Sequence, residues 1–293
     1  MIDAPPWREV HLPGVGPLRI RDSGPPEGEP DAPTILLIHG WTVSADLNWC
    51  RTYEPIARRA RVVAWDQRGH GSASIRARGR MRMEALADDA AAVVRALGVE
   101  RATAVGYSMG GAVAQTMWRR HPDLLDGLVL CATAMAFGLT ATERRDFAIM
   151  GASSLPARLA AALGRKDLGW RVARRASERQ AGASMGTGDA DFDRWAWDET
   201  RAGSLDHVLR AAWNLGRFDS SDWIHEVDVP HAVVVCGDDD VVPTARQRQL
   251  AHALPDATIV EIDADHAACV LRPDLFVPAL DSSLDAVHGP VPG

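Results

Sequence analysis

The chain alternates between short runs of consecutive apolar residues and longer stretches in which apolar residues recur every three or four positions. The run TILLIHG at 34–40 is too short for a helix and is bounded by turn residues, so it predicts a fully buried strand. Runs of the same type recur as RVVAW (61–65), ATAVGY (102–107), GLVLCA (127–132), HAVVVC (231–236) and ATIVEI (257–262). Strands that are apolar throughout are typical of a mostly parallel sheet with both faces covered.

The stretches between these runs predict helices. MEALADDAAAVVRALG at 83–98 ends at a glycine, and MGGAVAQTMWRRH at 109–121 ends before a proline, which are both common helix ends. Residues 10–22, VHLPGVGPLRIRD, predict a hairpin whose turn contains Pro and Gly. Strands alternating with helices predict the α/β class, with a mostly parallel sheet and helices on both faces.

The alternation stops between about residues 136 and 218, where helical segments rich in Ala, Arg and Trp replace the strand-like runs. We therefore predict a core in two parts, 1–135 and 219–293, with a helical insertion at 136–218. Trp195, Trp197 and Trp213 favour a lid over the carboxyl edge of the sheet, where open α/β folds bind ligands. The alternative is a helical layer that only adds stability.

Composition indicates an ordinary globular protein, because 46% of the 293 residues are hydrophobic and 24% are charged. The formal net charge of -7 disfavours nucleic acids and anionic membranes as partners. The arginine pairs are spread out and predict solvated helix faces. The start, MIDAPPWREV, has no basic segment followed by an apolar run, and no stretch approaches a membrane span, so we expect a cytoplasmic protein.

The cysteines are widely separated and form no CxxC pair, which predicts buried reduced thiols rather than disulfides or a zinc site. They are Cys50, Cys131, Cys236 and Cys269.

One serine has the sequence context of a nucleophile. Ser108 lies in GYSMGG, between a predicted strand and a predicted helix, and a strand, a tight turn and a helix are the context of a nucleophile elbow. At such an elbow the serine occupies a strained backbone conformation that projects its Oγ above the sheet edge. Gly106 and Gly110 remove the side chains that would collide where strand and helix meet.

A serine hydroxyl needs a base, and the base needs an acid that orients it. On this kind of sheet the chain order is serine, acid, histidine. GDDDVVP follows the strand HAVVVC, and DADHAACV follows ATIVEI, so the loops after the last two strands supply carboxylates and then His266 in the required order. The acid is one of Asp238, Asp239 and Asp240.

Two backbone N–H groups are candidates for an oxyanion hole. The helix that begins at Met109 directs its free N–H groups toward Ser108. The second donor is expected in the loop after the strand at 34–40, which assigns it to the N–H of Trp41. His39 is expected to brace this loop rather than to transfer a proton.

These motifs together resemble the α/β-hydrolase superfamily. HGW (39–41), DQRGHG (66–71), GYSMGG (106–111), GDDDVVP (237–243) and the late His266 carry the resemblance, which extends over about residues 20–280 except for the insertion. It implies an eight-stranded type of sheet with a helical cap inserted into it. We expect DQRGHG to structure the loop beside the site, with Asp66 and Arg68 in internal polar contacts, and we treat Asp22, Arg21 and the neighbouring loop as framework.

The resemblance gives two answers for the acid. Family members usually have it four residues before the proline in D-x-x-V-P, which corresponds to Asp239, whereas three residues after Gly237 is Asp240. We take Asp239 as the first choice and keep Asp240 and Asp238 as alternatives. The chain also departs from the family in having Asp265 before His266 where many relatives have glycine; Asp265 either raises the basicity of the imidazole or faces solvent.

The predicted activity is that of a serine hydrolase that acts on a carboxylic ester, thioester or lactone through an acyl-enzyme intermediate. Relatives that open epoxides and haloalkanes have aspartate at the elbow, so Ser108 argues against those reactions. No cofactor and no metal are required, and the partner is a small molecule, expected to be uncharged and partly hydrophobic. The alternatives are a C–C bond hydrolase, a lyase, a cofactor-free perhydrolase and a ligand-binding receptor without turnover. The oligomeric state is left open.

Overall fold

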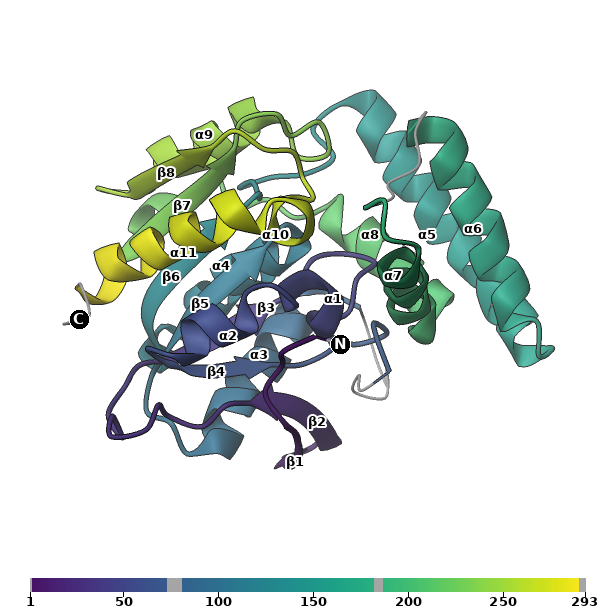
Figure 1. Cartoon of the computed structure of the whole chain (residues 1–293). Coiled ribbons are helices and arrows are strands. Elements are labelled where there is room, and N and C mark those ends of the chain that lie inside the picture. Colours follow the sequence, from purple (N-terminus) through teal and green to yellow (C-terminus); the bar gives the residue numbers. More distant parts are fainter. Residues whose placement is uncertain (1, 73–80, 182–186, 290–293) are drawn as a thin grey trace.

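The computed structural model describes residues 2–72, 81–181 and 187–289, and its centre is one twisted sheet (Figure 1). The described residues form an eight-stranded sheet in the order β1-β2-β4-β3-β5-β6-β7-β8. The first two strands form the predicted antiparallel hairpin, and all pairs from β4 to β8 are parallel. The strands are β1 (Trp7–Leu12), β2 (Gly16–Asp22), β3 (Thr34–Ile38), β4 (Arg61–Ala64), β5 (Ala102–Tyr107), β6 (Leu125–Cys131), β7 (His231–Cys236) and β8 (Thr258–Ile262). The predicted α/β class with a mostly parallel sheet is confirmed.

The apolar runs identify the strands because the central strands are covered on both faces. Every residue of β3 and β5 is buried. The prediction of a fully buried strand is wrong for β8, in which Thr258, Ile259 and Glu261 are exposed. Because β8 is the last strand of the sheet, it lacks a neighbour on one side, and its apolar residues are less covered than those of an internal strand.

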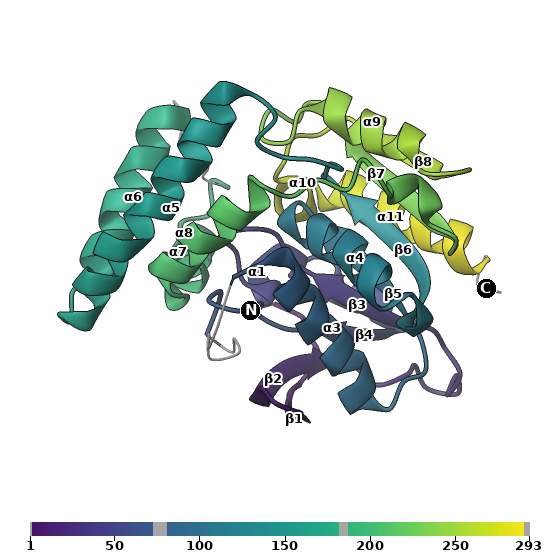
Figure 2. The ribbon, with the colours of Figure 1, turned by 180° about the vertical axis from the view of Figure 1, so that it is seen from behind.

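Helices cover both faces of the sheet and enclose two apolar cores (Figures 1 and 2). One face is covered by α3 (Met83–Leu97), α4 (Met109–Arg120) and α9 (Thr244–Ala253). The other face is covered by α1 (Ala45–Trp49), α2 (Tyr53–Ala57), α10 (Ala268–Leu271) and α11 (Pro273–His288). Helix α3 ends as predicted at Gly98, whose φ of 66° is left-handed and closes the last turn.

The predicted interruption of the alternation is helical in the described residues. It contains α5 (Ala141–Ala162), α6 (Lys166–Ala181), α7 (Ala190–Ala202) and α8 (Leu205–Leu215), while residues 182–186 lie outside the described part. An isolated antiparallel bridge joins Ala136 to Asp219. The chain thus leaves the sheet region and returns to it at one point.

All cysteine side chains are free and buried, as predicted. Burial is the largest cause that raises the pKa of the Cys50 thiol to about 11 and of the Cys236 thiol to about 12, so the thiols stay protonated near neutral pH. Among the described residues, no helix combines the length and the apolar composition needed to cross a membrane.

Candidate active site

Ser108 stands between the end of β5 and the start of α4, and its backbone has the unusual conformation φ 53°, ψ -117°. A non-glycine residue with positive φ is strained, and such strain persists only where neighbouring contacts enforce it. Here the Ser108 N–H donates to the Cys131 carbonyl (2.9 Å), and the Ser108 carbonyl accepts from the Thr133 hydroxyl (2.7 Å). These bonds fix the turn to strand β6, and the predicted strand, turn and helix are present.

The two elbow glycines allow the backbones of strand and helix to approach closely. A Cβ atom on Gly106 would lie 2.4 Å from the Gly110 carbonyl oxygen, and one on Gly110 would lie 2.0 Å from the Ile38 carbonyl oxygen. Both contacts are with backbone, which cannot move aside cheaply. The elbow therefore requires glycine at both positions for steric reasons.

Gly110→Ala is expected to destabilise the protein by about 3 kcal/mol, because the added methyl group overlaps the carbonyl groups of β3 and its loop. Urea unfolding followed by circular dichroism measures this change. Gly169→Ala in α6 is the matched control, since its added Cβ would meet only the flexible end of Leu205 at 3.0 Å. The control is expected to change stability by less than about 1 kcal/mol; equal midpoints for the two variants would contradict the steric argument.

Ser108, His266 and Asp239 form a continuous chain of hydrogen bonds. The Ser108 Oγ lies 3.0 Å from His266 Nε2, and His266 Nδ1 lies 2.6 Å from Asp239 Oδ2. The loop that carries the histidine is held by the Tyr107 hydroxyl, which donates to the His266 carbonyl (2.9 Å). Three loops far apart in the sequence therefore meet at the carboxyl edge of the sheet.

The structure brings Asp239 to the imidazole, while Asp238 and Asp240 are exposed. The buried Asp239 carboxylate also accepts hydrogen bonds from the backbone N–H groups of Val241 and Val242, both at 2.8 Å. A further bond comes from the Gln247 amide at 2.8 Å. These donors fix the carboxylate in one orientation toward His266.

The loop after β3 passes directly beside the serine. A Cβ atom on Gly40 would lie 3.4 Å from the Ser108 Cβ, and the Gly40 N–H donates to the buried Asn48 side-chain oxygen (2.9 Å). The next residue, Trp41, and the first helical residue, Met109, have backbone N–H groups that donate to no protein acceptor within the described ranges. The predicted pair of oxyanion donors therefore stays a prediction.

Comparison with known proteins agrees with this architecture. A family model described as the alpha/beta hydrolase fold matches residues 33–273. The chain belongs to the α/β-hydrolase family. It is 29% identical over 253 residues to the protein named "Putative carbamate hydrolase RutD" of Agrobacterium fabrum, which covers 84% of this chain and 90% of that protein.

Two further relatives are informative. The bifunctional esterase/perhydrolase DCH of Acinetobacter calcoaceticus is 41% identical over 97 residues, which are 33% of this chain and 34% of that protein. The solved structure of a thermophilic esterase from Thermogutta terrifontis superimposes with a TM-score of 0.76 at 22% sequence identity and covers 97% of this chain and 99% of that one. At that identity the superposition supports the fold alone.

In this α/β-hydrolase, the other predicted motif residues form the internal framework. Asp66 accepts a hydrogen bond from the Ala45 N–H (2.8 Å), and Arg68 forms a bidentate ion pair with the buried Asp89. Arg21 pairs with Asp46 in the same way, and Asp22 accepts from Arg61. Asp265 is exposed, and its carboxylate accepts a hydrogen bond from the Ala267 N–H, so it faces solvent.

His39 braces the loop beside the serine, as predicted from its position. Its Nε2 accepts from the Gln67 backbone N–H (2.8 Å), and its Nδ1 donates to the Gly40 carbonyl (2.7 Å). Burial, with a smaller contribution from the nearby His70, lowers the pKa of His39 to about 3. Burial also lowers the pKa of His70 to about 4. Both rings are therefore neutral near pH 7 and serve as structural parts of the loop.

These two histidines predict a loss of stability in acid. Their pKa values in the folded state lie below the ordinary value of 6.5, so the unfolded chain binds more protons below pH 6.5. Their contribution is complete above pH 6.5 and is lost as the pH falls toward their folded pKa values, by about 1.4 kcal/mol per pH unit for each histidine. Urea unfolding between pH 7 and pH 4.5 measures this slope. His39→Gln is expected to reduce the slope of unfolding free energy against pH by the contribution of one histidine, about 1.4 kcal/mol per pH unit. The exposed control His252→Gln should leave the slope unchanged. Equal slopes in the two variants would refute the assignment.

The helical insertion at 136–218 contacts the core at the loops near Ser108. The Trp41 indole N–H donates to the Val208 carbonyl of α8 (2.8 Å), and the Ser44 hydroxyl donates to Glu199 of α7 (2.6 Å). Ser204, which precedes α8, donates its backbone N–H to the Gly69 carbonyl (2.8 Å). Helices α7 and α8 therefore rest on the loops that follow β3 and β4.

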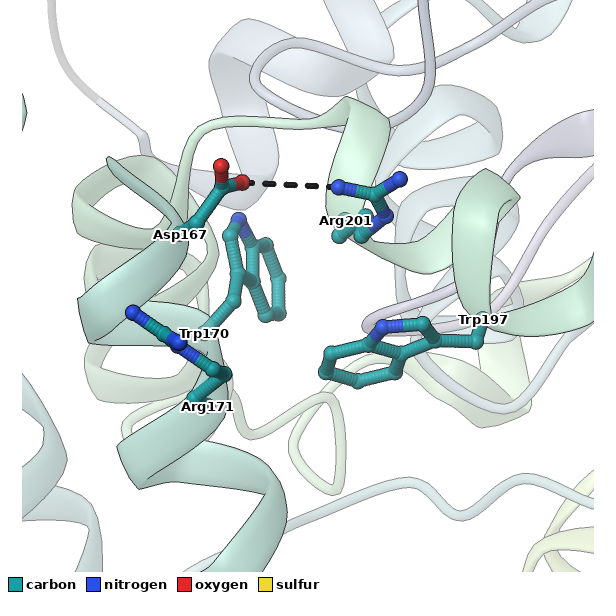
Figure 3. Close-up of a pocket in the computed structure, with 5 residues that line it drawn as sticks. All are labelled: Asp167, Trp170, Arg171, Trp197 and Arg201. Carbon is teal, nitrogen blue, oxygen red and sulfur yellow. Dashed lines mark hydrogen bonds and ion pairs between the residues drawn. The ribbon is translucent and has the colours of Figure 1, made fainter. Parts of the chain in front are cut away.

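A pocket of about 240 Å³ lies inside the helical segment, between α6 and α7 (Figure 3). Its aromatic lining comes from Trp170 and Trp197, whose rings meet edge to face with centroids 6.4 Å apart. Asp167, Arg171 and Arg201 complete the lining, with Arg201 and Asp167 forming an ion pair at 3.5 Å. The lining comes from α6 and α7 and includes neither Ser108 nor His266. Within the described ranges, no group of three or more His, Cys, Asp or Glu side chains is arranged to hold a metal ion.

Sequence reasoning missed two polar residues that support the site. Gln247 donates its amide to both Asp239 and the Val242 carbonyl, and its side-chain oxygen accepts from the Cys236 N–H (2.9 Å). Asn48 holds the loop that contains Gly40. Both side chains lie on short helical segments without a motif, and only their complete burial in the fold identifies them.

Proposed function

We propose that this α/β-hydrolase is a serine hydrolase that cleaves a carboxylic ester, thioester or lactone. The observation that carries the proposal is the hydrogen-bonded chain from Ser108 through His266 to Asp239, which begins at a serine held in a strained elbow. The names of the Agrobacterium and Acinetobacter relatives, a carbamate hydrolase and an esterase/perhydrolase, support hydrolysis of an acyl group.

In the proposed reaction Ser108 Oγ attacks the carbonyl carbon of the substrate while His266 Nε2 takes the hydroxyl proton. The imidazolium is stabilised by Asp239, which remains ionised. Collapse of the tetrahedral intermediate breaks the bond to the leaving group, which receives the proton from His266. A water molecule then attacks the acyl-enzyme with the same histidine as base, which releases the acid and restores Ser108.

The negative charge of each tetrahedral intermediate needs donors that are already in place. We assign this role to the backbone N–H groups of Trp41 and Met109, because Met109 follows Ser108 directly, Trp41 follows Gly40, which lies against Ser108, and neither N–H group has another acceptor among the described residues. The N-terminus of α4 adds the positive end of its dipole at the same point. Donors of this kind contribute about 3 kcal/mol each to transition-state stabilisation.

We assign residues 136–218 as a cap that borders the substrate, with core parts at 1–135 and 219–293. The contacts of α7 and α8 with the loops after β3 and β4 support this role. Such a cap favours a small, uncharged and partly hydrophobic substrate. We also assign the protein to the cytoplasm, because its four cysteines are free buried thiols.

The substrate class is tested with a panel of p-nitrophenyl esters of increasing chain length and a matched set of acyl groups that end in a carboxylate or an ammonium. We expect kcat/KM to be at least about tenfold higher for the uncharged esters, since burial of an unpaired charge under the cap is costly. Release of p-nitrophenol measures turnover. Faster turnover of the charged esters would rule out the proposed class while leaving the serine mechanism intact.

A perhydrolase reaction is the second candidate, favoured by the name of the Acinetobacter relative. It uses the same acyl-enzyme, with hydrogen peroxide instead of water as the attacking nucleophile, and it releases a peroxy acid. Addition of hydrogen peroxide to the same ester panel, with detection of the peroxy acid, distinguishes the two reactions.

A further inference from the structure

Helices α5 and α6 form a hairpin at the outer edge of the molecule in both views (Figures 1 and 2). Between residues 155 and 172, this hairpin carries five large apolar side chains that are well exposed. They are Leu155 (62%), Leu159 (57%), Leu163 (74%), Leu168 (45%) and Val172 (59%), and together they are called the hairpin face below. A patch of large exposed apolar side chains is uncommon on a globular domain and indicates an interaction surface.

These side chains do not belong to the interior of the helical segment. On α5 the three leucines are spaced four residues apart, which places them on one stripe of the helix. On α6, Leu168 and Val172 have the same spacing, whereas Trp170 lies between them in sequence and points to the opposite side, where it is 4% exposed and packs on Trp197 (Figure 3). The hairpin face is therefore the outer surface of both helices.

The same hairpin is strongly basic. Residues 155–175 contain a single acidic side chain, Asp167, which faces Arg201 of α7. Their basic side chains are Arg158, Arg165, Lys166, Arg171, Arg174 and Arg175. Lys166 donates to the Ala202 carbonyl and Arg174 lies over the Trp197 ring, so these two face α7, whereas Arg165, Arg171 and Arg175 flank Leu168 and Val172 along the chain. This segment is thus positive within a chain whose net charge is -7. Such a concentration of cations beside exposed leucines is the pattern of a segment that lies on a negatively charged membrane surface.

We infer that the hairpin face binds the surface of a lipid bilayer that contains anionic phospholipids. The leucines would enter the boundary between headgroups and acyl chains, and the arginines would lie among the phosphates. The expectation of no membrane partner came from the net charge of the whole chain. Salt screens charges that lie more than about 8 Å apart. A lipid surface therefore interacts with the local positive charge of the hairpin rather than with the net charge of the whole chain.

Charge also argues against a second copy of the chain as the occupant. Two hairpins packed through these faces would bring two sets of cations together, and like charges in close contact oppose association. A lipid surface instead supplies both the anionic groups and the apolar layer that the hairpin face requires. The inference does not depend on the proposed ester hydrolysis, because binding is measured without turnover.

The test is flotation of the full-length protein with vesicles of phosphatidylcholine alone or of phosphatidylcholine mixed with phosphatidylglycerol. We expect binding to the mixed vesicles that weakens as salt rises, and none to phosphatidylcholine alone. The double variant Arg171→Gln with Arg175→Gln is expected to lower the partition coefficient onto the mixed vesicles by at least about tenfold. Leu159→Gln with Leu168→Gln is expected to have an effect of at least the same size.

Two matched controls use exposed side chains outside the hairpin. Ile259→Gln on β8 and Arg101→Gln before β5 remove an exposed apolar and an exposed cationic side chain, and neither should change binding. All six substitutions in these four variants are at exposed positions and should leave the fold intact, which circular dichroism checks. Absence of flotation with mixed vesicles, or equal loss in the control variants, would overturn the inference. A dimer in sedimentation that the leucine variant dissociates would overturn it too, because the face would then bind a second copy.

Discussion

Replacement of Ser108 with alanine is expected to lower kcat for p-nitrophenyl ester hydrolysis by at least about 10⁴-fold while leaving the fold and the melting temperature nearly unchanged. The reason is that the remaining groups can still bind substrate and polarise its carbonyl, but no acyl-enzyme can form. A fluorophosphonate should add once to the native protein and not to the variant, as measured by intact mass.

The control for this experiment is Ser221→Ala, which removes an exposed hydroxyl that is hydrogen-bonded to Asp219 and lies outside the candidate site. It is expected to retain native turnover and the single adduct. Retention of both signals in Ser108→Ala would exclude Ser108 as the nucleophile. Absence of both signals from the native protein would favour the alternative of a ligand-binding receptor that keeps the fold without turnover.

The positions of Ser108 and His266 in the fold could be predicted because local sequence determines them. The elbow of Ser108 needs glycines at fixed offsets on each side, and these offsets follow from backbone clashes within one turn. His266 follows the last strand, so its place at the carboxyl edge follows from strand order alone. Features of this kind are visible in a sequence because each depends on a few neighbouring residues.

The contact of Asp239 with His266, and the residues that hold Asp239, could not be predicted as firmly, because they depend on contacts between distant elements. Spacing rules allowed both Asp239 and Asp240, and the choice follows from a loop whose N–H groups and Gln247 hold the Asp239 carboxylate. Gln247 and Asn48 have no pattern around them that distinguishes them from surface amides. The exposure of β8 was not predicted for a similar reason. The apolar pattern of one strand does not show whether that strand lies at the edge of the sheet.

Substitution of asparagine for Asp239 is expected to lower kcat by about 10⁴-fold with little change in KM. A carboxylate 2.6 Å from Nδ1 of His266 favours the tautomer in which Nδ1 carries the proton, and Nε2 is then able to accept the serine proton. An amide can instead present its N–H group to Nδ1, which favours the other tautomer, in which Nε2 carries the proton and cannot act as a base. Ester turnover at pH 7 measures the effect.

Asp238→Asn and Asp240→Asn are the matched controls, because they change the same functional group in the same loop at exposed positions. Each is expected to retain kcat within about threefold, since a solvent-screened charge near a site has a small effect. A loss in Asp240→Asn equal to that in Asp239→Asn would mean that charge in the loop, rather than one orienting hydrogen bond, supports the histidine. A loss of kcat in Asp239→Asn alone would mean that this one carboxylate determines the tautomer of His266. That role would explain why Gln247 and two backbone N–H groups hold the carboxylate in place.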